Sequence, residues 1–512
     1  MRSKNALRNL SFSLAYEVFI LVLGLIVPRF IILSYGDSIN GLTQTIQRLL
    51  TLVNLLQAGA VGASIFQMLA PVAENDYEKQ SAIMYASKRF FDRMGAIYLA
   101  IIMVCAVFFG FYLKDENLST LEIILSFCVL AVNGSLYFFF TSRYDIVFSS
   151  YQKKYLLTIS SFVERVVYYV LLFLVISGNL YFIFMYVALL FGGIVRVLVN
   201  TYFYKKLVKG NINKNPLDKS FKIQDRKYLM LASIGDQAVA AAPTVIVTSF
   251  VSLAASSVFS VYSMVYISLK TLINSFHHAV SAIFGNLVAT SGDKKIAEVF
   301  DALLYVFSML GVVLSSCCAF LFMDFIDLYS EGFTEGMYVQ PVLACFIVAY
   351  ISIFSIRTVI NFVSHSCGLF KVTCKATVVC GAVSLCVSVL ATVLFGMPYV
   401  MTGVLLYHFG TMCILVFSFQ KKISWFKLNK KWFLRIAVMV VLPVASWWFY
   451  KTGILHISGW IGWFAMAIIF ALIVSVILFV YTMVFDRKAF CLLFNYVKAV
   501  FGSPKKKSTA KE

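Results

Sequence analysis

The chain has 512 residues, of which 61% are hydrophobic and only 13% are charged. This composition is too apolar for a soluble chain of that length, and runs of roughly 20 apolar residues recur along it. A net charge of +20 would suggest nucleic-acid binding in a soluble protein, but most of the bases lie in loops between apolar runs. We therefore expect a membrane protein that binds no nucleic acid.

The apolar runs are too long and too uniform for the strands of a membrane barrel, so we expect an all-α integral membrane protein. The first run follows Arg2, Lys4 and Arg8 and lacks a small-residue cleavage site, which indicates a retained span. Fourteen transmembrane helices are predicted, at 10–33, 41–69, 94–113, 121–141, 156–177, 180–203, 229–252, 257–288, 296–323, 339–363, 372–395, 399–420, 433–450 and 458–485.

The polar stretch 204–228 separates two hydrophobic halves. It holds eight Lys and Arg against two Asp, which is typical of a solvated cytoplasmic loop. A shift of about 218 residues lays the first six spans over the next six, so we predict a parallel repeat of two six-helix lobes. The predicted divisions are an N-lobe 1–203, a linker 204–228, a C-lobe 229–420, two further helices within 421–485 and a basic tail 486–512.

The distribution of charge predicts the orientation in the membrane. Most Lys and Arg in connections fall on the side of the N-terminus, and only Lys114 and Lys451 fall on the other. The longest outer connection, 324–338, has four acidic residues and no base. By the positive-inside rule, this pattern predicts that both termini are cytoplasmic.

The eleven cysteines lie almost entirely inside apolar runs, and none shows paired CxxC spacing. They are interpreted as small packing residues, so neither a disulfide framework nor a metal site is expected. We expect no cofactor.

Bases inside spans need a water-filled cavity or a partner, because a charge in hydrocarbon costs several kcal/mol. Two polar stripes at helical spacing stand out, in equivalent spans of the two halves. The first consists of Gln44, Gln47, Arg48, Thr51 and Asn54. The second consists of Lys270, Asn274, His277 or His278, and Ser281.

We hypothesise that these two stripes face each other across a central aqueous cavity, where Arg48 and Lys270 attract an anionic head group. Arg165, Arg196 and Arg357 are further candidates for this cationic lining. For Arg196 and Arg357, pairing between helices or anchoring at the membrane interface is an equal alternative. A separate base, Arg29, lies near the outer end of its helix and is expected to snorkel to the interface.

Two acidic residues, Glu17 and Asp236, occupy equivalent places under the repeat. Each is a candidate for binding a coupling cation, H⁺ or Na⁺, and the alternative is simple neutralisation of a nearby base. The adjacent His277 and His278 face different directions, which favours packing or hydrogen bonding over metal binding. His408 is a weaker candidate for the cavity.

Several segments resemble the polysaccharide-transporter branch of the superfamily that also contains the multidrug and toxin extrusion antiporters. They are Leu25–Leu42, Leu55–Asp76, Val261–Leu269 and the Arg357 segment that ends at Gly368–Lys371. The resemblance implies a flippase for undecaprenyl-diphosphate-linked oligosaccharide in the bacterial cytoplasmic (inner) membrane. Such a protein works by alternating access in the assembly of a surface polysaccharide such as O-antigen. A polysaccharide polymerase and a chain-length regulator would be its partners, with membrane lipids around it.

Two other function classes compete with this reading. A cation-coupled multidrug or small-molecule antiporter would share the two-lobe fold, but cationic drugs favour an acidic cavity, and the charges within these spans are mainly basic. A membrane enzyme acting on polyprenyl substrates would need a sizeable extramembrane loop or acidic metal-binding motifs. The sequence has neither feature, so no catalytic residue is expected.

Overall fold

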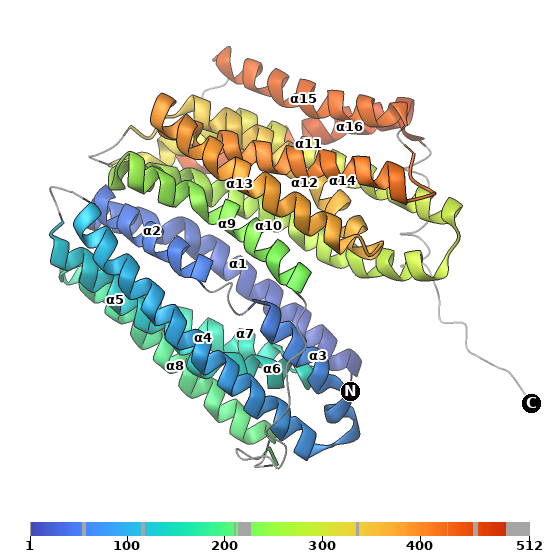
Figure 1. The fold of residues 1–512 in the computed structure, drawn as a ribbon. Coiled ribbons are helices and arrows are strands. Elements are labelled where there is room, and N and C mark those ends of the chain that lie inside the picture. The colour runs from blue at the N-terminus through green and yellow to red at the C-terminus, as the bar shows by residue number, and fades with distance from the viewer. Residues whose placement is uncertain are drawn as a thin grey trace, which may run out of the picture. The chain divides into compact units, whose positions relative to one another are not determined.

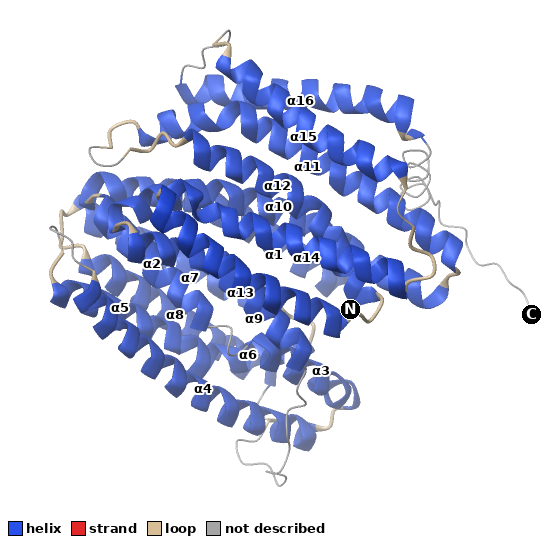
Figure 2. Ribbon diagram, turned by 45° about the horizontal axis from the view of Figure 1, so that its top comes forward, coloured by secondary structure: helices blue, strands red, loops and turns tan. Residues whose placement is uncertain are grey.

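The structure is a computed structural model that describes residues 2–53, 58–113, 118–208, 211–212, 227–333, 337–427, 429–453 and 459–487. Every extended regular element in these ranges is a helix, as Figure 2 shows. The chain forms two compact units. Unit 1 comprises Met1–Met264, Gly332–Met337 and Ser388–Val400; unit 2 comprises Val265–Glu331, Tyr338–Val387 and Met401–Glu512.

The helices of unit 1 are α1 (Arg2–Tyr35), α2 (Asp37–Val53), α3 (Ala58–Glu74), α4 (Tyr77–Tyr112), α5 (Thr120–Leu136), the π-helix η2 (Tyr137–Thr141), α6 (Ser142–Ser150), α7 (Tyr155–Ser177), α8 (Ile183–Val208), α9 (Lys227–Phe250) and the 3₁₀ helix η3 (Met397–Val400). Those of unit 2 are α11 (Asp293–Ser330), α12 (Pro341–Ser366), α14 (Met401–Lys422), α15 (Lys430–Lys451) and α16 (Gly459–Phe485). Two helices, α10 (Leu253–Thr290) and α13 (Phe370–Phe395), contribute to both units.

The chain is an all-α, multi-pass integral membrane protein, as predicted. Within the described ranges, twelve helical segments are long and apolar enough to cross a membrane. The two predicted spans outside this set are 41–69 and 229–252. The first is covered by the 17-residue helices α2 and α3, with 54–57 outside the described residues, and the second by α9. The count of fourteen therefore stays a prediction.

One helix begins well before its predicted span. The span 94–113 was placed on apolar residues alone, whereas α4 begins at Tyr77. Asp76 caps this helix, since its carboxylate accepts a hydrogen bond from the backbone N–H of Lys79 at 3.0 Å. That bond and the Lys79 ammonium hold the pKa of Asp76 below its ordinary value. Capping lets the helix continue through a charged segment that a hydropathy pattern excludes.

In unit 1, a polar seam joins α2 to α9 and to the first turns of α10. Asn40 donates from Nδ2 to the hydroxyls of Ser257 and Ser260, at 2.8 and 3.2 Å. The Thr45 hydroxyl is hydrogen-bonded to Thr248 on α9. Gly41 allows this close approach, because a Cβ there would collide with the carbonyl oxygen of Leu253. The seam explains why α9 belongs to unit 1, and the predicted lobes and repeat stay predictions.

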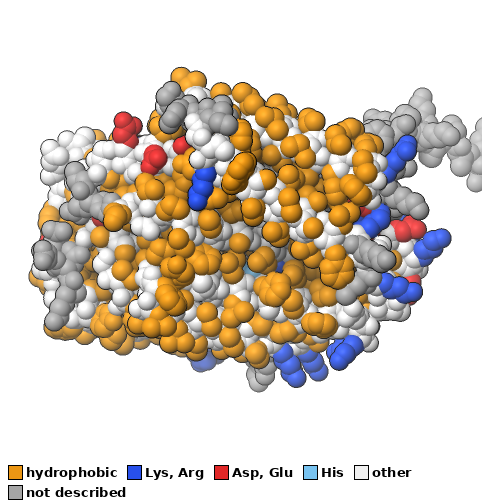
Figure 3. Space-filling view, turned by 90° about the horizontal axis from the view of Figure 1, so that it is seen from above, with side chains coloured by type: hydrophobic (Ala, Val, Ile, Leu, Met, Phe, Trp, Pro, Cys, Tyr) orange, Lys and Arg blue, Asp and Glu red, His pale blue; other side chains and the backbone are white. Residues whose placement is uncertain are grey.

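In unit 2, α11 is the central helix, packed against α12, α15 and α16 (Figure 1). Its side chains are buried along almost the whole length, from Ile296 to Tyr329. The outer face of α16 is apolar and exposed, with Ile461 88% and Leu472 62% accessible. Figure 3 shows hydrophobic side chains over most of the face in view. Such a surface is stable in contact with lipid.

Candidate functional site

Aromatic side chains join α10 to α12 within unit 2. The ring of Tyr266 lies 5.3 Å from that of Tyr350, and His277 and Phe284 lie 5.5 and 5.6 Å from Phe362. Positions 266, 270, 277 and 284 fall on one face of a helix with 3.6 residues per turn. Lys270 therefore lies on the face of α10 that packs on α12.

Lys270 is half-buried, and its ammonium nitrogen lies 5.5 Å from the centre of the Phe354 ring. This contact is a cation–π interaction, which stabilises a charge without neutralising it. The structure thus places the predicted base beside an aromatic side chain of α12.

Arg357, also predicted, lies deeper in the same region and is only 6% exposed. Its Nε donates to the hydroxyl of Thr411 at 2.9 Å, and one Nη donates to the hydroxyl of Tyr407 at 3.1 Å. The guanidinium also lies 4.8 Å from the centre of the Tyr407 ring. Positions 407 and 411 are one helical turn apart on α14, so they present both hydroxyls to the same guanidinium.

His408 completes this group from α14. The imidazole is 6% exposed, and its ring centre lies 5.0 Å from those of Tyr350 and Tyr407 and 5.6 Å from that of Phe354. Lys270 and Arg357 both act electrostatically on the ring. We call Lys270, Phe354, Arg357, Tyr407, His408 and Thr411 the Arg357 cluster.

The Arg357 cluster has the chemistry of an anion site. It brings a fork of N–H donors and an ammonium group into a low-dielectric region, where interactions with a phosphate are stronger than in water. The hydroxyls of Thr411 and Tyr407 fix the direction of the guanidinium without cancelling its charge. Sequence reasoning found the two bases and named His408 as a weaker candidate, but it missed Tyr407 and Thr411.

Two predicted bases of unit 1, Arg196 and Arg165, lie near Glu164 of α7. Arg196 on α8 forms an ion pair with Glu164 on α7, with 3.1 Å between Nη1 and the carboxylate. This matches the pairing alternative for Arg196. The neighbouring Arg165 is half-buried and interacts with Tyr169 on its own helix.

The remaining predicted residues are dispersed. Arg48 and Gln44 are half-buried on α2, and Thr51 is exposed and donates to the backbone carbonyl of Gln47. Asn274 is half-buried on α10, beside the face that carries His277. Asn54 lies outside the described residues, as does the side chain of His278. Arg48 belongs to unit 1 and Lys270 to unit 2, so their opposition across a cavity stays a prediction.

The two predicted coupling acids lie on unit 1. Glu17 is exposed on α1, and Asp236 is half-buried on α9. Arg29, on α1, lies with its guanidinium 5.8 Å from the centre of the Phe333 ring. A role for either acid in ion coupling stays a prediction.

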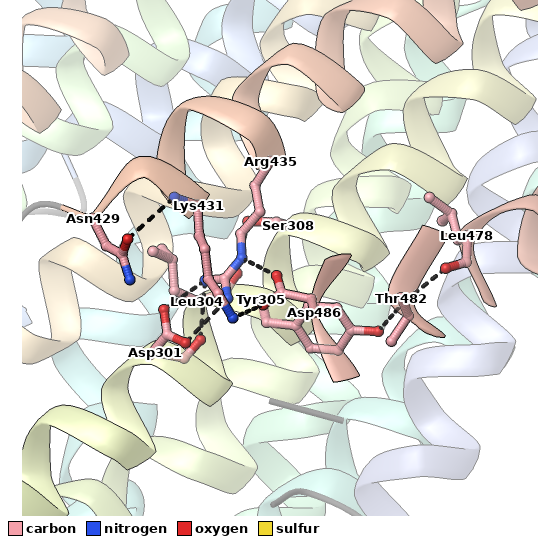
Figure 4. Close-up of polar contacts among 10 residues, drawn as sticks. All are labelled: Asp301, Leu304, Tyr305, Ser308, Asn429, Lys431, Arg435, Leu478, Thr482 and Asp486. Carbon is pink, nitrogen blue, oxygen red and sulfur yellow. Dashed lines mark hydrogen bonds and ion pairs between the residues drawn. The ribbon is translucent and has the colours of Figure 1, made fainter. Parts of the chain in front are cut away.

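Sequence reasoning also missed a second buried arginine, Arg435 on α15. It is 1% exposed, and its guanidinium lies between Asp486 and Asp301 (Figure 4). The Asp486 carboxylate accepts from Nε at 2.7 Å, and the Asp301 carboxylate accepts from Nη1 at 2.9 Å. Lys431 adds a contact of 2.9 Å to Asp486. We call Asp301, Lys431, Arg435 and Asp486 the Arg435 cluster.

The Arg435 cluster joins α15 and the end of α16 to α11. It contains two bases and two carboxylates, so its formal charges balance. Burial alone would raise the pKa of Asp486, but hydrogen bonds from Arg435 and Lys431 outweigh it and hold that pKa below the ordinary value. The sequence did contain a signal for this cluster. Arg435 is a base inside the predicted span 433–450, and it lies one helical turn after Lys431, so both bases share a helix face.

Solved structures share the fold of this chain. The lipid II flippase MurJ, in an inward closed conformation, matches with a TM-score of 0.67 at 15% identity, over 93% of this chain and 100% of the flippase. An inward-facing multidrug resistance MATE family transporter of the MOP superfamily matches with a TM-score of 0.61 at 13% identity, over 80% of this chain and 99% of that one. The Vibrio cholerae MATE transporter VcmN, in its bent form, matches with a TM-score of 0.52 at 12% identity, over 82% of this chain and 97% of that one.

Neither a protein-family model nor a curated protein matches the sequence. At these identities the structural likeness concerns the fold and leaves the substrate open. The chain therefore shares its fold with a lipid II flippase and with a multidrug resistance transporter of the MOP superfamily.

Proposed function

We propose that this protein is a flippase that moves undecaprenyl-diphosphate-linked oligosaccharide across the bacterial cytoplasmic membrane by alternating access, for the assembly of a surface polysaccharide. The observation that carries the proposal is the Arg357 cluster. It holds two bases, Lys270 and Arg357, among membrane-spanning helices of a transporter fold.

The diphosphate is the part of such a lipid that cannot cross hydrocarbon alone. Transfer of its charges from water into an apolar medium is strongly unfavourable, and bases within the spans lower that cost. A guanidinium suits this task because its fork of donors matches two phosphate oxygens, while an ammonium adds a flexible point charge. Arg357 and Lys270 supply one group of each kind.

The same bases argue against the competing antiporter function. A cationic drug near Lys270 and Arg357 would meet two like charges in a low-dielectric region, which raises its free energy. The likeness to MATE transporters is a likeness of fold, so it does not favour a cationic substrate.

The other predicted site residues enter as further proposals. Arg48 and Arg165 of unit 1 would be further cationic groups of the lining. Gln44, Thr51 and Asn54 of unit 1, and Asn274 and His277 of unit 2, would be polar groups that contact the head group or sugars. Arg196 would act from its ion pair with Glu164. Glu17 or Asp236 would bind the coupling ion, H⁺ or Na⁺.

A bacterial deletion strain tests the function. We expect lipid-linked oligosaccharide to accumulate in the inner leaflet, and we expect the wild-type gene to restore surface polysaccharide. Arg357→Gln should fail to restore it at an equal level of membrane protein. The matched control is Arg143→Gln, because Arg143 bonds the carbonyl oxygen of Phe139 on the preceding helical turn.

Two results would refute the proposal. One is a deletion strain in which lipid-linked oligosaccharide does not accumulate. The other is a strain that instead becomes sensitive to cationic dyes, with dye export restored by the wild-type gene, which is the behaviour of a multidrug exporter.

A further inference from the structure

The imidazole of His408 is the one member of the Arg357 cluster that can gain a charge near neutral pH. It is 6% exposed, and its Nδ1 is buried with no hydrogen-bond partner among the described residues. A buried polar atom without a partner costs free energy unless a ligand or a proton-linked change satisfies it. Neither packing nor the hydroxyl contacts of Arg357 account for this atom.

The described groups that lie against His408 or act on its charge are bases or neutral side chains. Helix α12 presents Tyr350, Phe354 and Arg357, and α10 presents Lys270. On α13, Cys380 lies against Gly410, one turn along α14 from Tyr407. The charged groups that act on the ring within the described residues are thus Arg357 and Lys270.

Both bases reach His408 through shared aromatic neighbours. Lys270 lies over the Phe354 ring and Arg357 over the Tyr407 ring, and His408 contacts both rings. A proton on His408 would place a third positive charge in this small volume, with the repulsion that follows in a low dielectric. We therefore take the imidazole as neutral when no ligand is bound.

A phosphate-bearing ligand reverses this balance. An anion held by Lys270 and Arg357 offsets their field at the ring, and its oxygen atoms can accept a hydrogen bond from a protonated imidazole. The positive charge of a protonated His408, which is unfavourable beside the two bases alone, then becomes favourable.

We propose that His408 takes up one proton when a diphosphate ester binds to Lys270 and Arg357, so that anion binding and protonation are linked. The proposal rests on the proposed function, because it uses the same anion site. It assigns the proton-linked group to unit 2, whereas the sequence pointed to Glu17 and Asp236 of unit 1. Linkage of this kind strengthens anion binding as the pH falls, by up to about tenfold per pH unit for one proton.

Calorimetry on the full chain in detergent micelles tests the linkage. Farnesyl diphosphate is titrated into the protein at pH 8 in Tris and in HEPES, whose heats of ionisation differ, so that the two enthalpies give the number of protons taken up. At about pH 8 the diphosphate itself is nearly fully ionised, since its last pKa is near 6. We expect uptake approaching one proton by the wild type.

Two variants assign that proton to a residue. His408→Gln should bind farnesyl diphosphate without this uptake and with a flatter dependence of Kd on pH. Should the variant not fold, His408→Asn serves in its place, and a wild type that takes up no proton at pH 8 overturns the linkage without any variant. The matched control His365→Gln, at the end of α12 and in contact with Phe370, should behave as the wild type.

The outcomes separate this inference from the function on which it rests. If the wild type binds farnesyl diphosphate without taking up a proton, or if His408→Gln takes up as many protons as the wild type, the linkage at His408 is wrong and the flippase proposal stands. If the wild type does not bind farnesyl diphosphate, or if Arg357→Gln binds it as tightly as the wild type, the anion site and the linkage both fail.

Discussion

Two buried arginines of unit 2 have hydrogen-bond partners of different chemistry. Arg435, 1% exposed, is held by the carboxylates of Asp486 and Asp301, whereas Arg357, 6% exposed, is held by the hydroxyls of Thr411 and Tyr407 and by the face of the tyrosine ring. Carboxylates neutralise a guanidinium and fix it, while hydroxyls only orient it. The first arrangement suits a joint between helices, and the second suits a site that receives a charge from outside.

The comparison shows that burial of a base in a membrane protein does not by itself indicate function. Arg435 satisfies the general expectation that intramembrane charges mark a site, yet its carboxylates make it a structural link from α15 and α16 to α11. The chemistry of the partners decides the role. The predictions below test whether the two arginines differ in this way.

Removing Arg435 should have the largest effect on stability. Arg435→Met leaves Asp486, itself 1% exposed, without its main partner, and breaking a buried ion pair costs about 3–5 kcal/mol. We expect a marked drop in the temperature at which the detergent-solubilised protein loses its monodisperse elution. The same loss in Arg357→Met would contradict the division of roles.

Removing the charge of Arg357 should act on binding instead. A hydrogen bond to a charged group contributes about 1.5–3 kcal/mol, so Arg357→Gln should weaken binding of farnesyl diphosphate by about tenfold to a hundredfold. The melting temperature should stay close to that of the wild type. Calorimetry measures the first quantity, and equal affinity in the two proteins would remove Arg357 from the site.

The two clusters should also respond differently to pH. The folded-state pKa of Asp486 is depressed, so its contribution to stability is complete above its unfolded value of about 3.9 and is lost only as the pH falls through the lower folded value. The difference in melting temperature between wild type and Asp486→Asn should therefore be constant from pH 8 to 5. A difference that already shrinks within this interval would show that the pairing is weaker than the structure indicates.

The smallest effect is expected at Lys431. Its side chain is 33% exposed, and Asp486 keeps Arg435 when it is removed. Lys431→Met should therefore lower the free energy of unfolding by less than about 1 kcal/mol, in the range of exposed ion pairs. A loss as large as that of Arg435→Met would mean that the cluster acts as a single cooperative network, and thermal denaturation of both variants side by side distinguishes these cases.

The sequence predicted the helical class because its apolar runs have the length of a membrane span. It could not define the start of α4, since the charged segment after Asp76 belongs to the helix but lacks a long apolar run. The span 41–69 is covered by α2 and α3, with 54–57 between them outside the described residues.

The candidate site was predicted in part for a similar reason. Lys270 and Arg357 stand out because a base in an apolar run is rare, and the structure places them around the same aromatic side chains. Tyr407 and Thr411 gave no signal, because hydroxyl and aromatic residues are common in spans and only the packing of α14 on α12 directs them at Arg357. Arg435 was overlooked near the start of its span, and its partners lie more than 50 residues away in either direction.

Flipping of a labelled lipid in vesicles tests the central claim most directly. The full chain is reconstituted in liposomes with a fluorescent undecaprenyl-diphosphate oligosaccharide, and dithionite added outside quenches the label as it becomes exposed there. We predict faster quenching with the wild type than in protein-free vesicles, a rate at least about tenfold lower for Arg357→Gln, and a wild-type rate for Arg143→Gln. Quenching no faster than in protein-free vesicles, or an Arg357→Gln rate equal to that of the wild type, would contradict the account.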